Sequence, residues 1–199
     1  MKKIIVSMIA ATTILAACNN SSSDNKKKNN TDTVQVTAAK ADTSIKQTTA
    51  SAADQPASIK EILAEYLQIK NAFAKDDSKE ASAAGNEMVK TFANFNKSAL
   101  TAEQTKIYND IEDDAREHAE HIGSNAGKIE HQREHFDMLS KDVYQLVKTF
   151  GGGQKLYYDH CPMYNDGKGA NWISETREIK NPYYGKSMST CGSVKEELK

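Results

Sequence analysis

The softest metal ligands of this sequence lie in its C-terminal quarter. Cys161 and Met163 flank Pro162 in the run CPM, and Met188 precedes Cys191 by three residues in MSTC. Thiolate and thioether groups select Cu(I) over hard cations. Two cysteines and two histidines would also satisfy tetrahedral Zn(II). Because zinc rarely uses thioether ligands, these residue types favour a copper site, with zinc as the second choice.

Four of the five histidines gather around one turn of the sequence. His118 and His121 end one helical pattern, His131 and His135 begin the next, and the run GSNAG separates the two pairs. Positions three or four apart share a helix face, so each pair can bind one ion. His121 and His135 lie at the edges of apolar stripes, which makes them the stronger ligand candidates. His118 is favoured as a hydrogen-bonded core histidine, and for His131 a surface position and a ligand role are evenly balanced.

Two other interpretations of the cysteines stay open. Outside the cytoplasm, Cys161 and Cys191 can form a disulfide, and closing a loop of this length would stabilise a small subdomain by about 3 to 4 kcal/mol. His160 stands beside Cys161, as a general base stands beside a thiol nucleophile. Neighbouring residues on a strand face opposite ways, so we expect no catalytic residue and no enzymatic activity.

The helices that must position these ligands begin at Ser58. From there on, apolar residues recur every three or four positions, whereas the preceding sequence is polar. Capping signals pair Ser58 with Glu61, Asp77 with Glu80, and Thr101 with Gln104. A fourth helix is expected from about Lys128 to Phe150, before three glycines. Each helix is amphipathic and the connections are short, so residues 58–150 predict a mainly α fold, an up-and-down antiparallel four-helix bundle.

A small irregular or β knob is expected to follow over residues 151–199. The helical period ends at the triple glycine, and the sequence becomes rich in aromatic residues and punctuated by glycine. Leu156–Cys161 and Ala170–Ser174 could pair as short strands around the turn-like run NDGKG. We expect the knob to pack on one side of the bundle, because its tyrosines and Trp172 need an apolar surface.

The N-terminal segment indicates export and membrane attachment. Residues 1–17 have two lysines, an apolar run and small residues, as in a secretory signal peptide, and LAAC resembles a lipobox that makes Cys18 the lipidation site. Residues 18–57 are polar and are expected to form a disordered tether. The chain would be extracytoplasmic and bound to a membrane, by preference the outer membrane facing the periplasm, through its lipid anchor. A formal net charge of −1 offers no general attraction to nucleic acid.

Two long runs carry a resemblance to a known family. HQREHFDMLSKDVYQLVKTFG and YYDHCPMYNDGKGANWISETREIKNPYYGKSMSTCG resemble a bacterial domain family of unknown function for which copper binding has been inferred. The family occurs in small lipoproteins and on periplasmic adaptor subunits of heavy-metal efflux pumps. The resemblance implies these metal ligands: His121, His135, Cys161, Met163, Met188 and Cys191. His118 and His160 are reserve candidates.

These observations predict a membrane-anchored extracytoplasmic protein that binds a metal ion. It would sequester Cu(I) or hand it on, in metal homeostasis or to an efflux system, with its two ligand groups meeting where the knob docks on the bundle. The alternative is a metal-free binding or structural lipoprotein with a Cys161–Cys191 disulfide.

Overall fold

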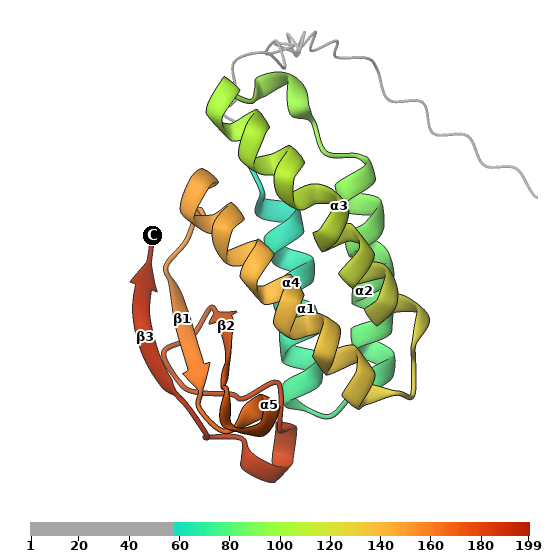
Figure 1. Cartoon of the computed structure of the whole chain (residues 1–199), viewed down its shortest axis with the longest axis vertical. Helices are drawn as coiled ribbons and strands as arrows, with labels where there is room; N and C mark the ends of the chain where they lie inside the picture. Colours follow the sequence, from blue (N-terminus) through green and yellow to red (C-terminus); the bar gives the residue numbers. More distant parts are fainter. Residues whose placement is uncertain (1–57) are drawn as a thin grey trace, which may run out of the picture. The chain divides into compact units, whose positions relative to one another are not determined.

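The computed structural model describes residues 58–199, so the predicted signal peptide, Cys18 and the tether lie outside the described residues. Four long helices make up most of this part: α1 (Lys60–Ala74), α2 (Ser78–Ala93), α3 (Ala102–Ser124) and α4 (Ile129–Phe150). A small three-stranded antiparallel sheet follows at the C-terminal end. Figure 1 shows the sheet beside α4 and α1, with α2 and α3 on the other side of these helices. None of the helices within residues 58–199 is long and apolar enough to cross a membrane.

Two of the three predicted helix starts have the expected side-chain caps. Thr101 and Gln104 form a complete capping box at α3, and Asp77 accepts hydrogen bonds from two backbone amides at the start of α2. Ser58 behaves differently, because its hydroxyl accepts from the Lys60 amide while Ile59 occupies the cap position without a side-chain bond. Ile59 is only 2% exposed, so packing of its side chain holds the start of α1 in place of a capping box.

The apolar stripes of the four helices meet in a common core, which continues into the sheet. Phe136 of α4 stacks on Tyr66 of α1 with ring centroids 5.2 Å apart, and it contacts Phe73 edge-on at 5.3 Å. Tyr183, from the segment after the second strand, lies 5.7 Å from the same ring. Tyr158 of the knob also stacks on Tyr144 of α4, with centroids 4.1 Å apart, so the knob packs on one side of the helices through aromatic rings, as the sequence predicts.

The sheet has β1 (Leu156–Cys161) at its centre, between β2 (Ala170–Ser174) and β3 (Ser193–Leu198). The predicted strands β1 and β2 have the expected bounds and pair antiparallel, joined by residues 162–169, which include the short α5 (Tyr164–Gly167). Asn165 and Asp166 of the NDGKG run take positive φ angles of 54° and 55°, which these short polar side chains tolerate. The sequence pattern does not predict β3, because this edge strand is mostly polar and only its last residue, Leu198, is buried.

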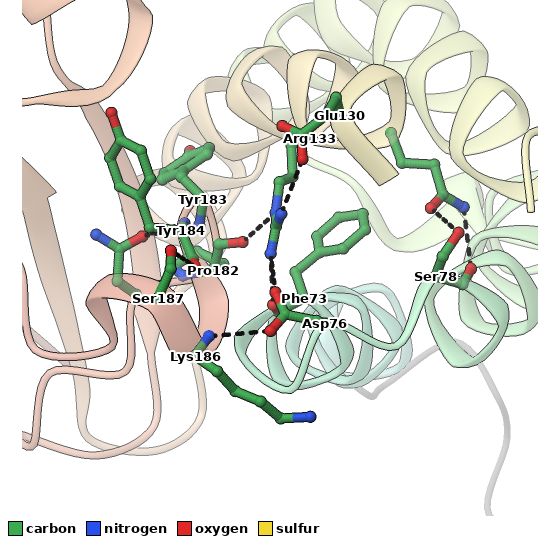
Figure 2. Close-up of polar contacts among 12 residues, drawn as sticks. Phe73, Asp76, Ser78, Glu130, Arg133, Pro182, Tyr183, Tyr184, Lys186 and Ser187 are labelled. Carbon is green, nitrogen blue, oxygen red and sulfur yellow. Dashed lines mark hydrogen bonds and ion pairs between the residues drawn. The ribbon is translucent and has the colours of Figure 1, made fainter. Parts of the chain in front are cut away.

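One buried arginine joins α4 to α1 and to the C-terminal segment (Figure 2). Arg133 is 4% exposed, and its guanidinium donates to the Phe73 carbonyl at 3.0 Å and to the Pro182 carbonyl at 2.8 Å. The same group binds the Asp76 carboxylate at 2.7 Å. Asp76 in turn accepts from the Lys186 amide at 3.1 Å, so one charged group satisfies backbone oxygens from two distant segments.

Candidate metal centre

Side-chain hydrogen bonds hold the turn between α3 and α4. The Asn125 side chain donates to the His121 carbonyl at 2.9 Å and closes the end of α3. The Gly127 amide donates to Ser78 Oγ of α2 at 2.6 Å, and its φ of +88° is one that glycine adopts without steric strain. The last turn of α3 and the first turns of α4 are thereby held next to each other.

A buried amide and a close helix contact secure the same hairpin. Gln132 is fully buried and donates to the Ile122 carbonyl at 2.8 Å and to the Ser78 carbonyl at 3.1 Å. At Gly85 of α2, a Cβ atom would lie 2.9 Å from the Ala119 carbonyl oxygen of α3. Only glycine allows α2 and α3 to come this close. The contact sets the position of the C-terminal half of α3, which carries His118 and His121.

Three imidazoles meet between the two helices. The rings of His121 and His135 stack with centroids 4.1 Å apart and planes 6° from parallel. His131 lies edge-on to His135 at 4.7 Å. One nitrogen of each ring lies within 4.8 Å of those of the other two, and all three residues are half-buried. The coordinating lone pair of an imidazole lies in the plane of its ring, so the stacked rings of His121 and His135 must turn towards a common point before a single ion can bind all three nitrogens.

His118 and two carboxylates surround these rings. His118 Nδ1 lies 3.2 Å from His135 Nδ1, so the fourth histidine of the hairpin joins the cluster. Glu117 lies 3.8 Å from His121 Nε2, and Glu134 lies 3.3 Å from His131 Nδ1. A carboxylate that is hydrogen-bonded to an imidazole nitrogen, as Glu134 is to His131, orients the ring and raises its basicity as a ligand.

The cluster holds two of its histidines in the neutral form. Burial, followed by the charges of His121, His131 and His118, lowers the pKa of His135 to about 4. Burial also lowers the pKa of His118 from its ordinary value. Neutral imidazole is the form that binds metal ions, so both rings are in the ligand state at neutral pH.

The two cysteines of the knob come together at a separate place. Cys161 at the end of β1 and Cys191 before β3 have Sγ atoms 3.2 Å apart, and both are free thiols. The hydrogen bond with Cys161, and then burial, raises the pKa of the Cys191 thiol. The pair satisfies the proximity that either a shared soft ion or a disulfide requires.

The methionines lie on the chain segments that flank this pair. The Cys191 amide donates to the Met188 carbonyl at 3.0 Å, and Met188 is half-buried. Met163 is 53% exposed, and its carbonyl accepts from the Tyr184 hydroxyl at 2.9 Å. His160, the reserve candidate on β1, has Nδ1 2.9 Å from Asn171 Oδ1 on β2.

The six predicted ligands thus fall into a histidine group and a sulfur group. Within residues 58–199, no set of three histidine, cysteine or acidic ligand atoms that lie within 4.8 Å of one another includes a thiol. β2 of the knob packs against α4 and α1, whereas the histidines face each other between α3 and α4. His131 and His118, which the sequence analysis ranked lower, lie inside the histidine group. Their spacing of three or four residues from the favoured histidines was the signal that pointed to them.

Comparisons with known proteins cover mainly the helical part. No curated protein and no solved structure matches the chain. A family model described as "Protein of unknown function (DUF3347)" matches residues 62–155. The chain is therefore similar, from α1 to the start of β1, to a family of unknown function, over a segment that contains the four clustered histidines and neither Cys161 nor Cys191.

Proposed function

We propose that this protein binds a transition-metal ion through His121, His131 and His135. The observation that carries the proposal is the convergence of three imidazole nitrogens within 4.8 Å of one another. Imidazole suits copper, zinc, nickel and iron, and three protein ligands leave a coordination position open. His118, with Nδ1 3.2 Å from that of His135, is the fourth nitrogen available to the ion.

Copper is the ion that we assign to this site, with zinc as its competitor. The general order of affinity of nitrogen sites places Cu(II) above Zn(II). The sulfur group supports the same metal in its other oxidation state, because two thiols 3.2 Å apart suit Cu(I). The protein would bind copper in either state and sequester it or hand it on, without catalysing a reaction.

The setting of this function is also a proposal. The lipobox-like LAAC sequence before the polar segment supports an anchor at Cys18 on an extracytoplasmic membrane, by preference the outer membrane, from which the domain could supply a metal efflux system. For the helical part we infer an up-and-down bundle, because each helix packs against the next along the chain and α1 also packs against α4.

The full chain carrying Cys18→Ser, which removes the lipid attachment site, together with Cys161→Ser and Cys191→Ser, which remove the thiols that would reduce Cu(II), is expected to bind one Cu(II) ion in a chelator-competition titration. Replacing His121, His131 and His135 together by alanine should weaken Cu(II) binding at least about 100-fold. Loss of a group that only orients a metal ligand typically costs about 10- to 100-fold in affinity, and this variant removes the ligands themselves. Titration with Zn(II) under the same conditions measures the preference between the two metals.

The matched control is His160→Ala, which removes one imidazole that bonds to Asn171 outside the cluster. This variant should retain the affinity of the parent chain. Equal Cu(II) affinity in the triple variant and the parent would refute the site.

The sulfur pair supports a second candidate, a metal-free lipoprotein with a Cys161–Cys191 disulfide. In the Cys18→Ser chain, a mild oxidant should convert both remaining thiols into an intramolecular disulfide, because their Sγ atoms are already 3.2 Å apart. Thiol titration and intact mass measure the change, and Cys191→Ser is the control. If Cu(I) bound beforehand protects both thiols from the oxidant, the pair serves the metal and the metal-free candidate fails.

A further inference from the structure

A groove of about 500 Å³ lies between the first turns of α4 and the knob. Residues from α4, from α5 and from the segment after β2 line it. This volume is in the range of sites for small organic ligands. Figure 2 shows Glu130 on α4, with Tyr183 and Tyr184 on the facing C-terminal segment.

Carboxylates dominate the charge of this groove. Glu130, Glu134 and Asp137 come from α4, and Asp166 comes from α5. Two cations offset them in part: Lys141 pairs with Asp137 at 2.9 Å, and the buried Arg133 lies 3.4 Å from Glu130. The groove is therefore electronegative and suits a cationic ligand.

Tyrosine rings form the other walls. Tyr164 stacks on Tyr183 with centroids 4.4 Å apart and lies edge-on to Tyr184 at 6.1 Å. The hydroxyls of Tyr183 and Tyr184 donate to backbone carbonyls, so their positions are set. Burial, followed by the charges of three groove carboxylates, raises the pKa of Tyr164 to about 12. Such rings attract organic cations through their faces.

One buried oxygen in this groove has no partner. Asp137 is 8% exposed; Lys141 binds its Oδ2, and Oδ1 has no hydrogen-bond partner in the described part of the chain. A buried carboxylate oxygen without a donor is unfavourable, and an N–H group of a ligand would satisfy it once the Asp137 side chain turns this covered oxygen towards the groove. Next to it, Met138 is 37% exposed and offers an apolar contact for a methylene chain.

The spacing of the carboxylates argues against a bare metal ion. Among residues 58–199, no three acidic oxygens of this groove lie within 4.8 Å of one another, so they cannot surround one small ion. Charges that are spread along a groove match a ligand whose cationic groups are also spread along a chain.

We propose that this groove binds a linear alkyl polyammonium ion, with one ammonium group donating to the Asp137 carboxylate and its methylene chain lying along Met138 and Tyr164. The other ammonium groups meet the carboxylates of Glu130, Glu134 and Asp166. None of the three proposed metal ligands lines this groove, and Glu134 is the residue through which it borders the histidine cluster. The binding of a polyammonium ion does not depend on the metal-binding proposal.

Isothermal titration of the metal-free Cys18→Ser chain with spermidine tests this site. We expect saturable binding of one spermidine per chain. Asp137→Asn should weaken it at least about tenfold, since hydrogen bonds to charged groups are worth more than neutral ones. Glu134→Gln, at an exposed position, should weaken it about threefold, as expected for a solvent-screened charge pair. Glu87→Gln, a matched charge change on α2, should have no effect.

Three results would overturn the proposal. One is unchanged spermidine affinity in both Asp137→Asn and Glu134→Gln, since the exposed variant cannot fail through misfolding. Another is displacement of spermidine by Mg²⁺ at equal ionic strength, which would indicate unspecific charge attraction. A third is equal affinity for butylammonium, a probe with the single ammonium of a peptide lysine. The triple histidine variant should bind spermidine normally, so this test can fail or succeed independently of the metal site.

Discussion

Asp159→Asn is expected to stabilise the protein by about 3 kcal/mol at pH 8, because removing a buried charge outweighs leaving an unpaired amide. Asp159 lies on the central strand β1 and is fully buried, and neither of its carboxylate oxygens has a hydrogen-bond partner among the described residues. Burial raises its pKa to about 7, against a smaller opposing effect of Lys70. Lys70 is itself bonded to Glu175 at 2.7 Å, so it does not neutralise Asp159 directly.

The raised pKa of Asp159 determines how the effect of Asp159→Asn on the free energy of unfolding changes with pH. The carboxyl group has a pKa near 4 in the unfolded chain and about 7 in the fold. Between these values the folded chain holds a proton that the unfolded chain has lost, so this group's contribution to stability decreases as pH rises and is constant above pH 7. The benefit of Asp159→Asn should therefore be small near pH 4 and largest above pH 7.

Urea unfolding at pH 4.5, 6 and 8 measures the effect as the difference in free energy of unfolding between variant and parent. Asp113→Asn is the control, because the side chain of Asp113 is 87% exposed and should change stability little. A difference for Asp159→Asn that does not grow with pH would show that its carboxylate is solvated in the fold.

Arg133→Ala is expected to destabilise the protein by about 3 to 5 kcal/mol, because it leaves buried oxygens without their donor. The guanidinium serves the carbonyls of Phe73 and Pro182 and the carboxylate of Asp76. A lysine has one compact ammonium and cannot reproduce this planar fork, so Arg133→Lys should recover only part of the loss.

The denaturant midpoint of each variant measures this loss, and Arg116→Ala on α3 is the control, since that arginine makes only a weak exposed pair. Gly185→Ala tests the same contact from the other side. Gly185 has a φ of +52°, and a Cβ there would overlap the Asp76 carboxylate and approach Arg133 Nη2 at 2.8 Å. Full stability of Arg133→Ala would mean that water replaces the guanidinium at these oxygens.

Local patterns predicted most of the secondary structure correctly. The capping pair Thr101 and Gln104, the glycines after Phe150 and the two strands around NDGKG all act through neighbours in the chain. The sequence analysis did not predict the third strand, Ser193–Leu198, because it lacks the alternation of apolar and polar residues that marks a half-buried strand. Its position in the sheet depends on backbone pairing with β1. At Ser58 the capping signal was present, yet the buried Ile59 took the cap position.

The candidate ligands could be named from residue type, but their grouping could not. Spacing of three or four residues placed His118 and His121 on one helix face and His131 and His135 on another. Whether those faces meet depends on how α3 packs on α4. His118 and His131 were ranked lower for a different reason, because His118 lies on the apolar stripe and His131 lies nearer the surface. The meeting of Cys161 with Cys191 likewise depends on the path of the chain between β2 and β3.

The sequence by itself determined the helices and the β1–β2 hairpin, because these follow from periodicity and local hydrogen bonding, and it named the sulfur and imidazole side chains that are candidates for binding a metal. Only the tertiary structure decided that the imidazoles of α3 and α4 face one another, and that the knob's β2 packs against α4 and α1. It also decided that Asp159 and Asp137 are buried with unpartnered oxygens. These features depend on contacts between residues far apart in the chain. The apolar stripe of a helix indicates which face is buried, but it does not specify which neighbour packs against that face or at what crossing angle.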